Sequence, residues 1–208
     1  MNELLKKCLV EFIGTFFLVL TIGCCVYSSQ NGIIPPLAIG FVLMVMVYAG
    51  GYVSGGHYNP AVSLACLIRG VLNIKDMLFY WISQIFAAFS AAVVVKQLLF
   101  VPASNPASFE LCKLMTCEIL FTFALCYVVL HTATSKETEG NSYYGLAIGS
   151  TVMVGAFATA GLCFGAFNPA VAFGLLTFGA AAKLIGITVF SNLIGGALAG
   201  VIFKLTAK

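Results

Sequence analysis

Six long apolar stretches, each about the length needed to cross a bilayer, constrain this chain more than any other feature. A spanning helix needs about 20 mostly apolar residues, and the stretches cover residues 8–28, 36–53, 76–98, 113–132, 145–162 and 183–203. Two further apolar segments, about 54–70 and 161–178, are broken by glycine and proline and are too short to cross alone. Only 8% of the residues are charged, against about 25% in soluble domains. The pattern predicts an all-α membrane protein with six transmembrane helices and two re-entrant half-helices, in one domain over residues 1–208.

Basic residues in short loops predict the orientation, because they concentrate on the cytoplasmic side. With the amino terminus inside, the inner residues are Lys6, Lys7, Arg69, Lys75, Lys136, Lys204 and Lys208, and the outer ones are Lys96, Lys113 and Lys183. This asymmetry favours both termini being cytoplasmic. The basic residues do not cluster as in a nucleic-acid-binding protein. The cysteines lack metal-ligand spacing, and no nucleophile, base and orienting group occur as a set, so we expect no metal, no cofactor and no enzymatic activity.

The chain repeats itself internally. Three short motifs recur at matched spacing: Glu11-Phe-Ile-Gly-Thr-Phe16 with Glu118-Ile-Leu-Phe-Thr-Phe123, Leu37-Ala-Ile-Gly40 with Leu146-Ala-Ile-Gly149, and Asn59-Pro-Ala-Val62 with Asn168-Pro-Ala-Val171. They predict a duplication, with repeat 1 at about 8–98 and repeat 2 at about 113–206. Each repeat holds three spans, and an odd number of spans makes the second repeat enter the bilayer from the opposite side. The two repeats are therefore expected to be inverted.

The repeated Asn-Pro pair indicates a helix start. Asparagine is a good N-cap, and proline is favoured at the next position because its missing N–H is not needed there. The pairs Asn59-Pro60 and Asn168-Pro169 thus predict two half-helices that meet near the bilayer centre with their positive ends. Such a centre repels cations. We also expect the amides of Asn59 and Asn168 to orient a water molecule so that a single file of waters cannot relay protons.

The paired Asn-Pro-Ala boxes, the Glu-x-x-x-Thr-Phe starts and the compact layout of six spans resemble the aquaporin or major intrinsic protein family over nearly the whole chain. The resemblance implies a homotetramer in the lipid bilayer with one pore in each protomer, passing water or small neutral solutes. It assigns the pore boxes to Asn59, Pro60, Ala61, Asn168, Pro169 and Ala170. It also implies that Glu11 and Glu118 brace the re-entrant loops through backbone hydrogen bonds, and that His57 contributes mainly a backbone carbonyl. Two amides at nearly equivalent positions, Gln84 and Asn192, suggest further bracing.

In this family, selectivity is set at four positions near the outer mouth. Spacing from the boxes assigns them to Ile39, Ala156, Gly165 and Val171, whereas Val62 in the first copy is assigned no role. Water-selective members typically carry an aromatic residue, a histidine, a small residue and an arginine there. This chain lacks the histidine and the arginine, which predicts a wider and more apolar filter. Glycerol-conducting members usually keep the arginine, add an aspartate beside it and have a longer following stretch, so the substrate signals conflict.

Three functional interpretations remain open from the sequence. The first is a broad channel for water and small neutral solutes such as glycerol, urea, ammonia or hydrogen peroxide. The second is a mainly water-selective channel whose mouth is narrowed by side chains that spacing does not locate. The third is a cell-contact or scaffold protein with a closed pore, or a channel that leaks ions.

Overall fold

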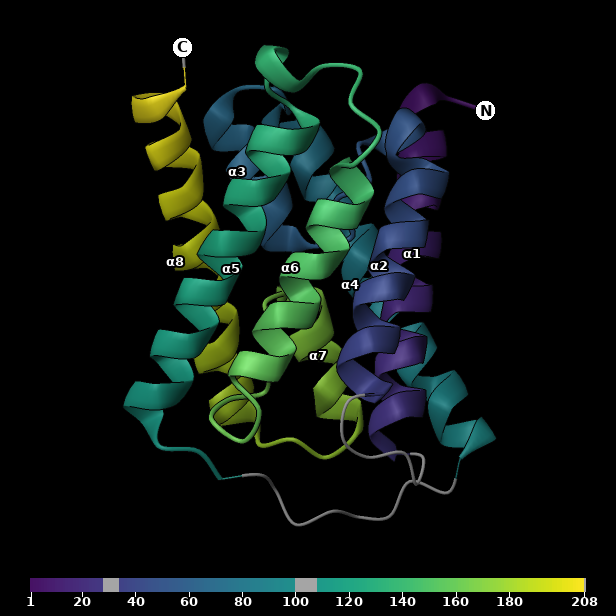
Figure 1. Ribbon diagram of the computed structural model, residues 1–208. Coiled ribbons are helices and arrows are strands. Elements are labelled where there is room, and N and C mark those ends of the chain that lie inside the picture. The colour runs from purple at the N-terminus through teal and green to yellow at the C-terminus, as the bar shows by residue number, and fades with distance from the viewer. Residues whose placement is uncertain (28–33, 100–107, 208) are drawn as a thin grey trace.

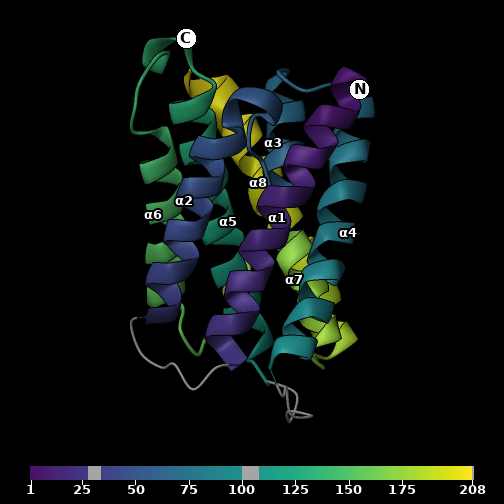
Figure 2. The same cartoon turned by 90° about the vertical axis from the view of Figure 1, so that its right-hand side faces the viewer.

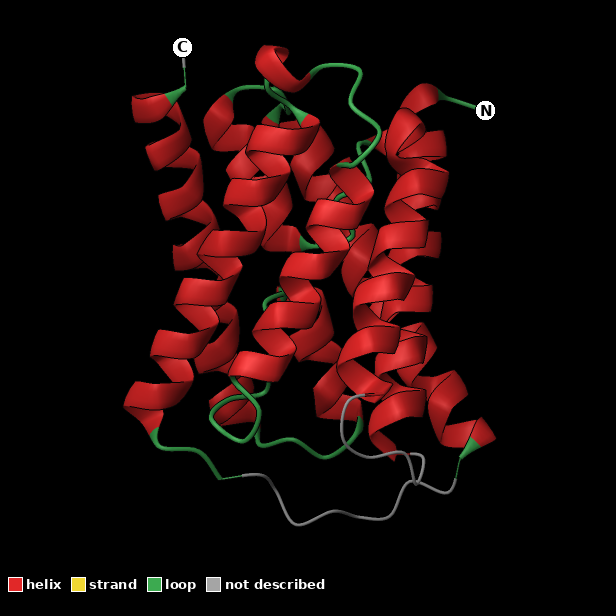
Figure 3. Ribbon diagram, viewed as in Figure 1, coloured by secondary structure: helices red, strands yellow, loops and turns green. Residues whose placement is uncertain are grey.

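A computed structural model describes residues 1–27, 34–99 and 108–207, and it contains helices but no strand within those ranges. The elements are α1 (Glu3–Tyr27), α2 (Ile34–Ser54), α3 (Pro60–Arg69), α4 (Ile74–Leu98), α5 (Leu111–Ala133), the short 3₁₀ helix η1 (Lys136–Thr138), α6 (Tyr144–Ala158), α7 (Pro169–Thr177) and α8 (Ala182–Thr206). Figure 3 shows these helices aligned along one bundle axis, which confirms the predicted all-α class. Residue 28 of the first predicted span and Lys208 lie outside the described residues.

Five of these helices, α1, α2, α4, α5 and α8, are long and apolar enough to cross a membrane, and each has at least 21 residues. The helix α6 is shorter than the predicted span 145–162: it has 15 residues and ends at Ala158, so the predicted carboxyl end is wrong. A helix of that length covers about 22 Å, less than the hydrocarbon thickness of about 30 Å. The physical reason is a turn directly after the helix. Thr159 donates from both its backbone N–H and its hydroxyl to the Gly155 carbonyl, and Gly161 has a positive φ of 78°.

The two halves of the chain exchange their half-helices. Within the bundle, α1 packs on α4, α5 packs on α8, and α2 packs on α6. The half-helix α3 of the first half packs most closely on α8 of the second, whereas α7 of the second half packs on α4 of the first. Figures 1 and 2 show α3 and α7 entering from opposite ends of the bundle. Each half therefore completes the core of the other.

The repeated Leu-Ala-Ile-Gly motif lies where α2 and α6 cross. A Cβ atom added to Gly40 would lie 2.7 Å from the Gly149 carbonyl oxygen, and one added to Gly149 would approach Gly40 more closely still. Only glycine allows these two backbones to come so near. The Leu-Ala-Ile-Gly motif is thus a helix-packing contact, in which each copy supplies one of the two glycines.

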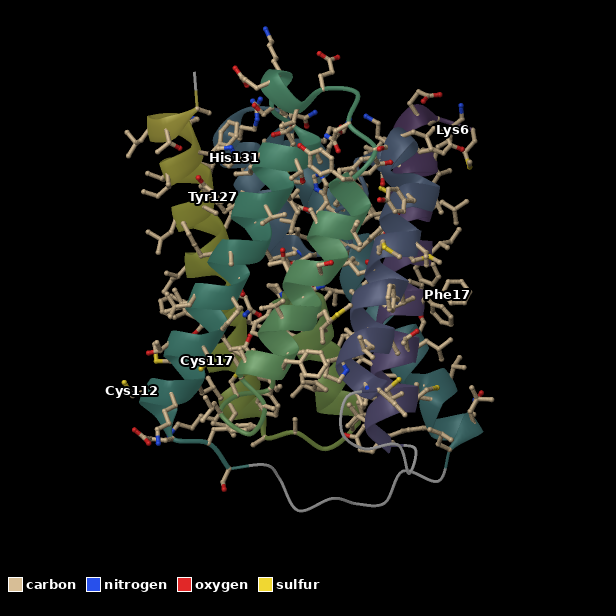
Figure 4. The ribbon with its side chains drawn as sticks, in the orientation of Figure 1. Lys6, Phe17, Cys112, Cys117, Tyr127 and His131 are labelled. Atoms are coloured by element: carbon tan, nitrogen blue, oxygen red, sulfur yellow. The ribbon has the colours of Figure 1, made fainter. Side chains whose placement is uncertain are left out.

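The amino and carboxyl termini lie at the same end of the bundle. In Figure 4, Lys6 marks that end and Cys112, in the first turn of α5, marks the other. This arrangement agrees with an even number of membrane crossings between the termini. The side of the membrane that each end faces stays a prediction.

Candidate functional site

The helix starts at Asn59 and Asn168 have nearly identical geometry. Their backbone angles are φ −159°, ψ 119° and φ −160°, ψ 114°, and a proline follows each as the first helical residue. The Asn59 side-chain oxygen accepts from the Ala61 N–H at 2.9 Å, and the Asn168 oxygen accepts from the Ala170 N–H at the same distance. Each asparagine oxygen is thus used to cap its own half-helix. Its amide nitrogen is left available for other partners.

The two asparagine side chains also connect the loops that precede the half-helices. The Asn59 amide donates to the Phe167 carbonyl at 2.8 Å, and the Asn168 amide donates to the Tyr58 carbonyl at 2.8 Å. Tyr58 and Phe167 have positive φ values of 50° and 46°, a region that large side chains rarely adopt. Because a side-chain amide has two N–H donors, each asparagine has a second N–H besides the one that bonds to the opposite loop. Nothing in the sequence alone indicates this reciprocal pair of bonds.

Glu11 organises the first re-entrant loop. Its carboxylate accepts from the Ser54 hydroxyl at 2.7 Å, from the His57 N–H at 2.9 Å and from the Tyr58 N–H at 2.6 Å. The Gln84 amide adds a fourth donor at 2.8 Å. Glu11 and Gln84 are both fully buried. One buried side chain therefore satisfies two backbone N–H groups of a non-helical loop, those of His57 and Tyr58.

Glu118 occupies the equivalent place in the second repeat. It accepts from the Ala166 N–H at 3.0 Å, from the Phe167 N–H at 2.9 Å and from the Asn192 amide at 2.7 Å. Asn192 also donates to the Thr122 hydroxyl at 3.0 Å. Glu118 and Asn192 are fully buried. The offset that relates Glu11 to Glu118 thus relates two carboxylates with the same structural task.

Ser54 and Cys163 form a further equivalent pair that the sequence reasoning missed. The Gly56 N–H donates to the Ser54 hydroxyl at 3.1 Å, and the Gly165 N–H donates to the Cys163 sulfur at 3.2 Å. Cys163 is therefore more than the small packing residue that its apolar surroundings suggest. The sequence does indicate this equivalence, because Ser54 and Cys163 are 109 positions apart, as are Asn59 and Asn168.

A cavity of about 350 Å³ lies between the half-helices and the end of the bundle opposite the termini. All four predicted filter residues line it, namely Ile39 from α2, Ala156 from α6, Gly165 from the second loop and Val171 from α7. Asn59 and Asn168 line its inner part, and none of the described residues that line it is aspartate, glutamate, lysine or arginine. Val62, to which spacing assigned no role, also lines this cavity. We call this space the outer cavity.

A second cavity of about 330 Å³ lies toward the end that holds both termini, and we call it the inner cavity. His57 and Val129 line both cavities and therefore separate them; we call their place the junction. The His57 ring lies 3.0 Å from the Ser63 hydroxyl through Nδ1, and its backbone N–H is held by Glu11. The residue is thus positioned through both its ring and its backbone at the junction, whereas the family resemblance implies mainly a backbone contribution. The described residues contain no cluster of histidine, cysteine and acidic side chains suited to a metal.

Taken together, these elements define a helical membrane protein in which two capped half-helices meet beside two adjacent cavities. The family described as Major intrinsic protein matches residues 1–203, and the chain belongs to it. The chain is an integral, multi-pass membrane protein.

Several relatives carry aquaporin names. The chain is 34% identical over 190 residues to Aquaporin NIP1-1 of Arabidopsis thaliana, covering 82% of this chain and 63% of that relative. It therefore spans less than two thirds of that relative's length. Aquaporin Z of Brucella melitensis is 29% identical over 230 residues, covering 97% of each chain. The crystal structure of the aquaglyceroporin from Plasmodium falciparum has the same fold, with a TM-score of 0.81 at 17% identity over 98% of this chain and 96% of that one.

Proposed function

We propose that this chain is a passive channel for water and small uncharged solutes such as glycerol, urea, ammonia or hydrogen peroxide. The observation that carries the proposal is the outer cavity, whose described lining has no charged side chain and whose filter positions hold Ile39, Ala156, Gly165 and Val171. An ion that entered it would lose hydration without gaining a charged partner, at a cost of several kcal/mol. Neutral solutes avoid that cost.

The two half-helix starts supply polar contacts at the centre. Each asparagine amide keeps one N–H donor after its bond to the opposite loop, at 2.8 Å in both cases. A water or hydroxyl oxygen that accepts from both donors would direct its hydrogens outward, which opposes proton relay. The positive ends of α3 and α7 add a barrier to cations, each equivalent to about half an elementary charge. We assign the exclusion of protons and cations to the pore boxes, the support of the re-entrant loops to the bracing carboxylates, and the selection of solutes to the filter residues.

A mainly water-selective channel is the second candidate, and one feature favours it. The rings of Tyr27 and Phe164 also line the outer cavity, and the Phe164 ring packs edge-on against Phe109 with centroids 4.8 Å apart. A ring held in this way narrows the mouth in spite of the small residues at Ala156 and Gly165. The names of the relatives include both aquaporins and an aquaglyceroporin, so they support both candidates.

Stopped-flow swelling of proteoliposomes under water, glycerol and urea gradients tests these candidates. We expect wild-type protein to accelerate all three fluxes over empty vesicles, and Val171→Arg to reduce glycerol and urea flux about tenfold while water flux falls less. Val171→Leu is the matched control, because it adds bulk without charge. Acceleration of water flux alone would favour the second candidate. No acceleration for any solute would contradict channel function and favour a cell-contact protein with a closed pore.

The same vesicles, loaded with a pH-sensitive dye, test proton exclusion in the absence of a filter arginine. We expect no proton flux above that of empty vesicles, since the half-helix ends and the asparagine amides oppose it. Dye acidification in step with an imposed gradient would favour an ion-leaking channel.

We also propose that the protein is a homotetramer with one pore in each protomer, that both termini are cytoplasmic, and that it acts without a cofactor and not as an enzyme. The termini lie at one end of the bundle, and the basic residues favour the inner side for that end. Native mass spectrometry measures the assembly, and protease accessibility of terminal tags in sealed cells measures the orientation. A monomeric mass, or tags cleaved from outside, would contradict these proposals.

A further inference from the structure

A separate cavity lies away from the pore, at the end of the bundle that holds both termini. It measures about 290 Å³ and lies between the end of α3, η1 and the end of α8. Figure 1 shows the carboxyl terminus and the loop with η1 at this end. Its lining includes Arg69, Lys136 and Lys204, three of the ten lysine and arginine residues of the chain, and one acid, Glu137. We call it the basic pocket.

Arg69 is held in a fixed orientation at the edge of the basic pocket. Its Nε–H donates to the Thr134 hydroxyl at 2.7 Å, and Nη2 donates to the Thr134 carbonyl at 2.7 Å. The guanidinium also stacks on the Phe203 ring, 4.8 Å from its centroid. Its other terminal nitrogen, Nη1, has no hydrogen bond to a residue that the structure describes. An arginine positioned in this way offers donors that suit the oxygens of a phosphate group.

The positive charge of the basic pocket is only partly neutralised by the residues that line it. Within the described ranges, the ion pairs are Lys6 with Glu3 and Lys113 with Glu110, and neither involves this pocket. The carboxylate of Glu137 accepts from the Ser135 hydroxyl, and this bond, its own backbone N–H and the charges of Lys136 and Arg69 lower the Glu137 pKa. Glu137 is therefore ionised at neutral pH and cancels one charge. Three cations against one anion leave an excess of two positive charges.

The position of the basic pocket indicates which phosphate it meets. Lys204 lies in the last turn of α8, beside Val201 and Leu205, whose side chains are 46% and 75% exposed. In a spanning helix these apolar side chains face lipid tails, and basic side chains at helix ends face the headgroups. Basic pockets between spanning helices on the cytoplasmic side suit anionic headgroups. We propose that the basic pocket binds the phosphate of an anionic membrane lipid, held by Arg69, Lys136 and Lys204.

Native mass spectrometry of the full-length protein in an uncharged detergent tests this site. The protein is titrated with dioleoyl phosphatidic acid and, separately, with dioleoyl phosphatidylcholine. We expect one tightly bound phosphatidic acid per chain and no such binding of phosphatidylcholine. Each lysine near an anionic surface contributes about a fivefold change in affinity, so Lys136→Gln with Lys204→Gln should weaken binding about 25-fold.

The matched control is Lys96→Gln with Lys183→Gln, which removes two lysines predicted to lie on the opposite side; it should stay within about twofold of wild type. Equal weakening in both double variants, or equal binding of the two lipids by wild type, would overturn the proposal. Inorganic phosphate is added in a third experiment as a competitor.

If it displaces phosphatidic acid at equal concentration, the ligand is a soluble anion and the assignment to a lipid is wrong. The measurement is independent of permeability, so its outcome does not depend on the proposed channel function.

Discussion

The loops before α3 and α7 follow nearly the same backbone path, with Tyr58 at φ 50° and Phe167 at φ 46°. Their side chains differ. His57 in the first loop corresponds to Ala166 in the second, 109 residues later, and both line the outer cavity. The first loop thus places a ring at the junction of the two cavities, whereas the second places only a methyl group at its equivalent position. The duplicated backbone therefore builds a symmetric frame, and unequal side chains at one pair of positions break that symmetry.

Loss of a carboxylate that braces a loop, Glu11 in the first or Glu118 in the second, has the largest expected effect, which is on stability. Replacing Glu11 or Glu118 with leucine leaves several buried donors without an acceptor, and each costs about 1–3 kcal/mol. Glu11 accepts from four donors, and Glu118 accepts from Ala166, Phe167 and Asn192. We expect both variants to lower the free energy of unfolding by about 4 kcal/mol or more, with Glu11→Leu the more severe. Denaturation in mixed micelles measures this.

Glutamine at the same two positions is the control, because it keeps one carbonyl acceptor and the volume of the side chain. We expect Glu11→Gln and Glu118→Gln to retain more stability than the leucine variants. If leucine and glutamine were equally tolerated, the carboxylates would not be bracing the loops.

Exchanging the unequal side chains of the loops gives the next effect. Ala166→His should narrow the outer cavity and lower glycerol and urea permeability about tenfold, with a smaller loss for water, because steric discrimination in a site reaches at least this size. His57→Ala should widen the junction with the inner cavity and raise solute flux. Stopped-flow swelling measures both. Ala166→Ser is the control for a polar change without added bulk. An equal loss of water and solute flux in Ala166→His would mean that this position does not discriminate between water and solutes.

The smallest effect concerns Ser54 and Cys163, which accept equivalent backbone bonds at 3.1 and 3.2 Å. Cys163→Ser should change the unfolding free energy by less than about 1 kcal/mol, since a hydroxyl replaces the thiol as acceptor. Ser54→Ala should cost more than Cys163→Ser, because it also removes the 2.7 Å donor to Glu11. Thermal unfolding followed by circular dichroism compares them. A larger cost for Cys163→Ser than for Ser54→Ala would contradict the equivalence.

Much of the frame is predictable from residues alone. The Asn-Pro pairs predict both half-helix starts, and α3 and α7 begin at Pro60 and Pro169. The apolar stretches predict the long spans to within a few residues. The end of α6 was not predictable, because residues 159–162 are apolar enough to continue a helix. The turn formed by Thr159 and Gly161 ends it instead. Hydropathy measures transfer into lipid, whereas local hydrogen bonding decides where a helix stops.

The sequence by itself determined the membrane class, the repeated motifs and the two helix starts, because hydropathy, capping and proline chemistry act over a few neighbouring residues. Only the tertiary structure decided that Asn59 bonds to Phe167 and Asn168 to Tyr58, and that α3 packs on α8. It also brought Val62 and Val171 to one cavity. These contacts join residues about a hundred positions apart, and their formation depends on how two half-helices from opposite ends share the same space.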